Sequence, residues 1–282
     1  MKFLEKSMRT VFAASALTAI LAVGLICVFL FAGGIPAIAE IGIFKFLSGL
    51  DWSPTYDEFG ILPMIVGSLY VTAGAILIGT PVGLFTAIFM AKLCPKPLYR
   101  VLKPAMDLLA GIPSVVYGFF GMVILVPFVR NTFGGNGSSI LTASILLGIM
   151  ILPTIIGVSE SALRAVPSEM YEGAVALGAS HERAVFGVLL PAAKSGVMAA
   201  VVLGVGRAIG ETMAVKMVAG NQAVLRAPGE FLRGVRTLTA NVVLEMGYAE
   251  GMHRDALIAT GVVLFVFILI INLLFSVLKR ER

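Results

Sequence analysis

The sequence predicts an all-α membrane protein with six transmembrane helices and both termini in the cytoplasm. Of its 282 residues, 59% are hydrophobic and only 13% are charged, whereas soluble domains carry about 25% charged residues. The mean hydropathy is +1.00. The apolar residues gather in runs long enough to cross a bilayer. This composition excludes a soluble domain, and because no long basic block occurs, nucleic acid is not expected as a partner.

The expected transmembrane segments are residues 11–39, 61–91, 105–129, 140–159, 195–219 and 256–278. The first run is nearly twice as long as the hydrophobic region of a signal peptide, so we expect it to be retained as a helix. We divide the chain into an N-terminal helix with its extracytoplasmic loop (1–60), a core of five spans that includes segment 160–194 (61–278) and a cytoplasmic tail (279–282). The polar connection 220–255 is long enough for a short helix at 237–249.

The basic residues give the orientation of these helices. Thirteen of the 21 Lys and Arg residues lie in the two termini and in the loops 92–104 and 160–194, and six lie in the loops between them. Basic residues concentrate on the cytoplasmic side of membrane proteins. The sequence therefore predicts that both termini and segment 160–194 are cytoplasmic.

Two opposite charges, Arg207 and Glu211, lie inside the expected fifth span. A charge at the centre of a bilayer costs roughly 2.5–3.5 kcal/mol on insertion scales, so we expect both side chains to face protein or a water-filled path. On one continuous helix, residues four apart share a face. Arg207 is suited to a tetrahedral oxyanion, and Glu211 would hold the guanidinium when the path is empty. A permanent structural ion pair is the alternative.

Two further polar side chains, Ser114 and Tyr117, lie in the expected third span. Their hydroxyls are candidates for contact with a passing anion, and packing inside the bundle is the simpler interpretation.

Segment 160–194 is amphipathic and too polar to span the membrane. Ser168 is expected to cap a first helix, Gly178 to end it, and Ser180 to cap a second helix that runs to Leu190 before Pro191. The pattern predicts a cytoplasmic helix–turn–helix. Either it docks on a partner protein or it lies on the lipid headgroups.

The same segment resembles the EAA loop of type I ABC importer permeases. The resemblance rests on Glu172-Gly173-Ala174, then Gly178, then Val188-Leu189-Leu190-Pro191, at the family's spacing. Gly173 stands where the family has Ala, and Val188 where it has Ile. In that family the loop docks into a cleft of the ATPase subunit. The resemblance therefore implies an ATPase-coupling role for Glu172, Gly173, Ala174, Gly178 and Pro191.

A second resemblance concerns the substrate. Residues 206–214 are similar to the fifth helix of permeases for tetrahedral oxyanions, and residues 110–118, 60–69 and 236–240 resemble the PstC family of phosphate permeases. The resemblance implies a complex in a bacterial or archaeal plasma (inner) membrane. Its other members would be a PstA-like second permease, two PstB-like ATPase subunits and an extracytoplasmic PstS-like phosphate-binding protein.

This chain is not expected to be an enzyme or to hold a cofactor or metal. It has no G-x-x-x-x-G-K-[ST] motif, so ATP and Mg would be bound by the partner ATPase.

Three alternative functions remain open: a permease for sulfate or molybdate, a secondary anion transporter driven by an ion gradient, and a membrane scaffold that transports nothing.

Overall fold

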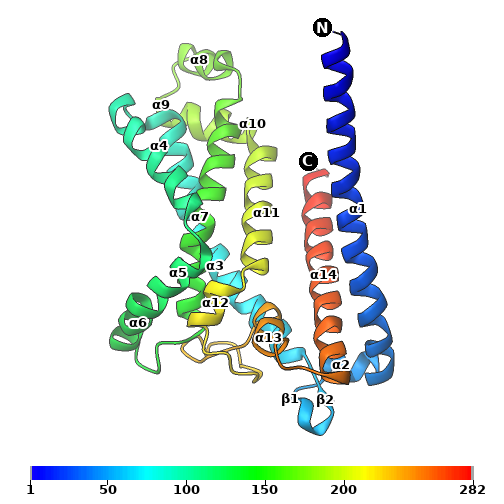
Figure 1. Cartoon of the computed structure of the whole chain (residues 1–282). Helices are drawn as coiled ribbons and strands as arrows, with labels where there is room; N and C mark the ends of the chain where they lie inside the picture. The colour runs from blue at the N-terminus through cyan, green and yellow to red at the C-terminus, as the bar shows by residue number, and fades with distance from the viewer. Residues whose placement is uncertain (1, 281–282) are drawn as a thin grey trace.

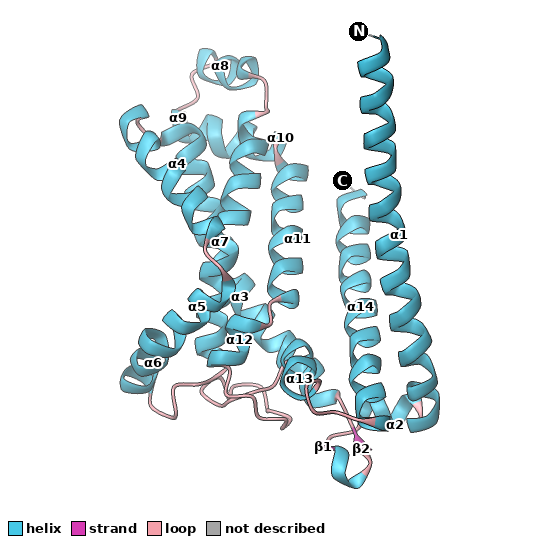
Figure 2. Ribbon diagram, viewed as in Figure 1, coloured by secondary structure: helices cyan, strands magenta, loops and turns pink. Residues whose placement is uncertain are grey.

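The computed structural model describes the backbone of residues 2–280 and the side chains of residues 7–274. The fold is almost entirely helical (Figure 2). Five helical segments are long and apolar enough to cross a membrane: Ser7–Ile41, Leu62–Leu93, Ser114–Phe133, Ile140–Arg164 and Gly251–Leu274. A sixth crossing is formed if the bent pair His181–Ala192 and Lys194–Gly210, which meet at 72°, counts as one span. The predicted all-α membrane fold is confirmed.

Both ends of the chain lie at the same end of the molecule as α8 (Ser168–Ala176), as Figure 1 shows. The opposite end carries α2 (Ile43–Ser48), the hairpin β1 (Trp52–Ser53) and β2 (Glu58–Phe59), and α13 (Leu238–Glu245). This arrangement agrees with cytoplasmic termini and a cytoplasmic segment 160–194. The predicted tail, 279–282, lies partly outside the described residues, and the division of the chain at residue 60 stays a prediction.

The first and last helices are neighbours. α1 (Lys2–Ile41) packs along α14 (Gly251–Arg280), and the pair stands beside the remaining helices (Figure 1). Gly34 brings the two backbones together, because a Cβ there would lie 3.1 Å from the Cα of Ala259. Small residues at such contacts allow close helix packing in membranes.

The centre of the bundle is the pair α3 (Leu62–Ile88) and α7 (Ile140–Arg164). α3 continues into a π-helical turn, η2 (Phe89–Leu93). Gly79 lies at a close contact between the two helices, since a Cβ there would be 2.8 Å from the carbonyl oxygen of Gly148. The largest apolar core forms around this contact and includes Val71, Leu147 and Ile151.

The third span begins later than expected. Residues 105–111 belong to an amphipathic helix, α4 (Lys96–Gly111), and the span itself comprises α5 (Ser114–Phe120), a π-helical turn η3 (Gly121–Leu125) and α6 (Val126–Phe133). The predicted start at residue 105 is wrong. Pro95 and Pro97 begin a helix here, because proline is well tolerated in a first helical turn.

The fifth span is broken. α11 (Lys194–Gly210) ends before Glu211, whose backbone is extended, and a short helix, α12 (Met213–Val218), follows. The expectation of one continuous helix over 195–219 is therefore wrong. Broken helices occur at membrane depth where they face protein or a cavity.

The extracytoplasmic end is fastened by one buried carboxylate, Glu245 of α13. It accepts hydrogen bonds from Trp52 Nε1 at 2.7 Å and from Arg236 Nη1 at 2.5 Å, and His253 Nε2 lies 2.9 Å away. Thr237 caps α13 by accepting from the backbone N–H of Ala240. The predicted helix within 237–249 is confirmed, although it is shorter than expected.

Candidate functional site

Arg207 lies in the last turn of α11 and is half-buried. Its Nη1 donates a hydrogen bond of 3.0 Å to the hydroxyl of Thr154 on α7, so the guanidinium is turned toward the bundle. Within the part of the chain whose side chains are described, no carboxylate oxygen lies within 4.0 Å of it. A cation inside a span with only a hydroxyl partner retains donors for an anion.

Glu211 does not pair with Arg207, so the expected ion pair is wrong. Its Oε1 accepts from the backbone N–H groups of Thr212 and Ala214, both at 3.2 Å. The carboxylate thereby satisfies two donors that the start of α12 would otherwise leave free. Because the helix breaks after Gly210, positions 207 and 211 no longer share a face.

Hydroxyl groups that were not predicted as site residues lie around the break between α11 and α12. A small cavity there is lined by Glu211 and by the side chains of Ser68, Thr72, Thr237 and Thr239, among others. Its volume is about 10 Å³, which is roughly the space that one water needs. This conformation therefore has no room for a tetrahedral oxyanion beside Glu211. Ser68 and Thr72, which lie inside an apolar span, were the available sequence signal.

Ser114 and Tyr117 are on α5, which packs against α12. Tyr117 is buried in the main core, and its hydroxyl donates a 2.9 Å hydrogen bond to the carbonyl of Leu109 on α4. Ser114 is half-buried at the first residue of α5. The Tyr117 hydroxyl is thus engaged with the backbone in this conformation, as the packing interpretation expects.

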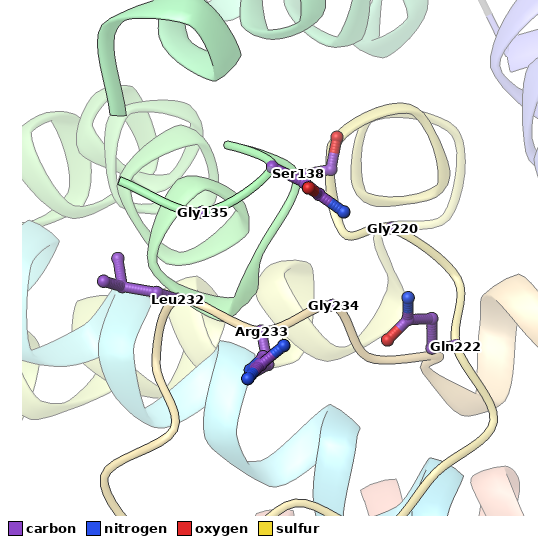
Figure 3. A pocket seen from close by; sticks show the side chains of 8 residues that line it. Gly135, Ser138, Gly220, Gln222, Leu232, Arg233 and Gly234 are labelled. Carbon is purple, nitrogen blue, oxygen red and sulfur yellow. The ribbon is translucent and has the colours of Figure 1, made fainter. Parts of the chain in front are cut away.

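An open hollow of about 560 Å³ lies on the extracytoplasmic side, between the loop before α7 and the loops after α12 (Figure 3). Its lining contains one cation, Arg233, and no carboxylate; the other lining residues are Gly135, Asn136, Ser138, Gly220, Gln222, Leu232 and Gly234. Its electrostatic character therefore favours an anion in this hollow. This hollow was not predicted from the sequence.

The cytoplasmic segment forms the expected helix–turn–helix. α8 is followed by Gly178 with φ +86°, and Ser180 caps α9 (His181–Ala184) by accepting from the backbone N–H of Arg183. The predicted roles of Gly178 and Ser180 in the turn are confirmed.

The predicted cap by Ser168 is wrong, because Pro167 takes the cap position and Ser168 is already helical. The second helix does not stop before Pro191, since a π-helical turn, η4 (Val185–Leu189), leads into α10 (Leu190–Ala192).

The candidate coupling residues lie on the outside of this segment. Glu172, Gly173, Gly178 and Pro191 are exposed, and Ala174 is half-buried. Leu177, next to the turn, is 92% exposed. α8 projects beyond the ends of the neighbouring helices (Figure 1). An exposed leucine on a projecting helix turn offers apolar surface to a partner.

The family described as "Binding-protein-dependent transport system inner membrane component" matches residues 79–281. The chain belongs to this family. Curated relatives match nearly the whole chain. The "Probable ABC transporter permease protein YqgH" of Bacillus subtilis is 41% identical to this chain, and the match covers 95% of this chain and 90% of the relative. The "Phosphate transport system permease protein PstC" of Mesorhizobium japonicum is 36% identical, over 92% of this chain and 84% of the relative.

Solved structures of ABC transporters share the fold of this family member. A chain of a bacterial ABC transporter involved in the import of the acidic polysaccharide alginate matches with a TM-score of 0.60 at 16% identity, over 98% of this chain and 99% of that one. A chain of the MetNI methionine ABC transporter matches with a TM-score of 0.59 at 21% identity, over 79% and 94%. The chain is therefore a multi-pass membrane protein with the fold of ABC importer permeases.

Proposed function

We propose that this chain is the permease subunit of an ATP-driven importer that moves inorganic phosphate across the plasma (inner) membrane of a bacterium or archaeon. The observation that carries the proposal is Arg207, a half-buried cation at the break of the fifth span whose partner is one hydroxyl. Relatives that match most of this chain are named phosphate transport system permease proteins. A permanently charged planar guanidinium suits a tetrahedral oxyanion.

The rest of the importer would consist of a PstA-like second permease, two PstB-like ATPase subunits that bind ATP and Mg, and a PstS-like extracytoplasmic binding protein. The binding protein would release phosphate near the hollow that contains Arg233. The ATPase subunits would engage the exposed segment with Glu172, Gly173, Ala174, Gly178 and Pro191. Because the cavity beside Glu211 is too small for the anion, passage requires the helices around it to separate.

In this scheme Arg207 and Glu211 have different tasks. Arg207 would exchange Thr154 for phosphate, whereas Glu211 holds the first turn of α12 through its two backbone hydrogen bonds. Ser114 and Tyr117 would line the path on the facing helix α5.

The test is uptake of radiolabelled phosphate into proteoliposomes that hold the reconstituted complex. Arg207→Gln is expected to lower uptake by about 10- to 100-fold, because it removes charge-assisted hydrogen bonds of about 1.5–3 kcal/mol. Lys216→Gln is the matched control, since it removes another cation from the same broken span, and its uptake is expected to stay within about twofold of wild type.

Three outcomes would contradict this proposal. Normal uptake by assembled Arg207→Gln would remove Arg207 from the path. Equal uptake of labelled sulfate would favour a general oxyanion permease. Uptake that continues without ATP at a fixed membrane potential would favour a transporter driven by an ion gradient.

A further inference from the structure

A buried carboxylate, Glu160, lies near the cytoplasmic end of α7. Its side chain is only 3% exposed. The Tyr99 hydroxyl donates a 2.6 Å hydrogen bond to Oε1, Arg164 Nε donates one of 2.8 Å to the same oxygen, and Lys103 Nζ lies 3.5 Å from Oε2. Because Tyr99 and Lys103 are on α4, the carboxylate joins α4 to α7.

Arg164 extends this connection to the end of α3. Its Nη2 donates a 2.9 Å hydrogen bond to the carbonyl of Met90, inside the π-helical turn η2. Its guanidinium carbon also lies 4.6 Å from the centre of the Tyr99 ring, which is within the range of a cation–π contact. Three elements, α4, α7 and η2, are thus held together around Glu160.

The coupling segment contacts the same elements. Lys92 of η2 lies over the Tyr171 ring of α8, with Nζ 5.7 Å from the ring centre, and the Tyr171 hydroxyl is bonded to His181 Nδ1. Tyr171 also packs against an apolar cluster that includes Leu163 of α7 and Leu189 of η4. A displacement of α8 therefore acts directly on η2 and on the cytoplasmic end of α7.

At its other end, α4 leads to the candidate anion path. Tyr117 of α5 bonds to the carbonyl of Leu109 across the break between α4 and α5. α5 in turn packs closely on α12, since a Cβ on Gly118 would lie 3.0 Å from the Cα of Ala214. Movement of α4 is thereby communicated to the helix that Glu211 caps.

We propose that Glu160 is a positioning residue that couples the ATPase-facing segment to the anion path by fixing α4 to α7. The role rests on the proposed function, because it requires ATP-driven transport. When α8 is pushed, α7 and η2 move, and the bonds of Glu160 make α4, α5 and α12 move with them. Without those bonds α4 can lag behind, and ATP is hydrolysed without opening the path.

The ionisation of the partners suits a permanent connection. The hydrogen bond to Glu160 and burial raise the pKa of Tyr99, so its hydroxyl keeps the proton that it donates. Burial lowers the pKa of Lys103, but the Glu160 and Asp107 carboxylates outweigh it and the net shift is upward. Tyr99 and Lys103 therefore stay protonated at cytoplasmic pH, and the connection does not depend on pH near neutrality.

The test measures phosphate transported per ATP hydrolysed by the full complex in proteoliposomes. Glu160→Gln keeps the size of the side chain and removes its charge. We expect ATP hydrolysis within about twofold of wild type and a transport-to-hydrolysis ratio that falls by about 3- to 30-fold, the range for coupling through packed networks. Tyr99→Phe removes one hydroxyl and is expected to lower the ratio by a smaller factor, so it serves if Glu160→Gln does not assemble.

Asp107→Asn is the matched control. Asp107 also contacts Lys103, at 3.4 Å, but its side chain is 65% exposed, and we expect an unchanged ratio. A ratio equal to wild type in both Glu160→Gln and Tyr99→Phe overturns the role of Glu160, as does a parallel fall of transport and hydrolysis, which a merely structural residue would produce. A wild-type complex that transports no phosphate overturns the proposed function itself.

Discussion

Replacing Glu245 with glutamine is expected to loosen the extracytoplasmic end of the protein. The carboxylate is bonded to Trp52, Arg236 and His253, and its side chain is 9% exposed. Glutamine has nearly the same shape but carries no charge, and its amide nitrogen is a donor that faces other donors. The variant therefore tests the charge and the hydrogen bonds of Glu245 with little change in packing.

The expected loss of stability follows from the partners that remain. Removing one member of a buried ion pair costs about 3–5 kcal/mol. Arg236 is 18% exposed and keeps two acceptors at 3.0 Å, Asn241 Oδ1 and the Asn221 carbonyl, so we expect about 2–3 kcal/mol. At about 2–4 °C per kcal/mol, the melting temperature should fall by about 4–12 °C.

The assay is thermal unfolding in detergent followed by circular dichroism, with tryptophan fluorescence as a local reporter. Trp52 is the only tryptophan of the chain, and it donates to Glu245 itself. Glu250→Gln is the matched control, because Glu250 is exposed on the following loop. If Glu245→Gln melts within about 1 °C of wild type, the Glu245 carboxylate does not stabilise the extracytoplasmic end as its contacts indicate.

Three further predictions concern other parts of the molecule. Gly79→Val should destabilise the protein by about 1–3 kcal/mol, because its Cβ would lie 2.8 Å from the Gly148 carbonyl, whereas Gly24→Val, with open space around it, should not; equal melting temperatures would contradict the close α3–α7 contact. Thr154→Val should alter the apparent KM for phosphate by about 2- to 10-fold, since Arg207 loses its hydroxyl partner; an unchanged KM would mean that Thr154 does not orient Arg207. Leu177→Asp should weaken binding of the ATPase subunit by about 10-fold or more, as measured by co-purification. The melting temperature should stay the same, because Leu177 is 92% exposed. Undiminished co-purification would place the contact elsewhere.

The features that the sequence predicted well are those set by local pattern. Apolar runs located the membrane-crossing helices, and the turn residues Gly178 and Ser180 have the expected geometry, because each depends on its own few neighbours. Local pattern was misleading at the start of the third span, because proline can either interrupt a helix or lie in its first turn. Residues 105–111 were expected to begin the third span and instead belong to α4, in whose first turn Pro97 lies.

The candidate path could not be predicted from spacing alone. The separation of Arg207 and Glu211 implies a shared face only if the helix is continuous, and Gly210 precedes a break that only tertiary packing decides. Likewise, each of the buried carboxylates Glu160 and Glu245 has a hydrogen-bond partner from a distant segment, and Tyr99 is 61 residues from Glu160. Trp52 and Glu245, for example, are 193 residues apart, and no local pattern joins them.

The pairing of α1 with α14 has a consequence for biosynthesis. The two helices are neighbours in the finished protein, yet α14 is synthesised long after α1. Trp52 must wait for 193 further residues before its partner is made, about 10–40 s at a synthesis rate of about 5–20 residues per second. Until α14 is made, α1 lacks the helix along which it packs, so truncation before residue 251 would leave α1 permanently without this contact.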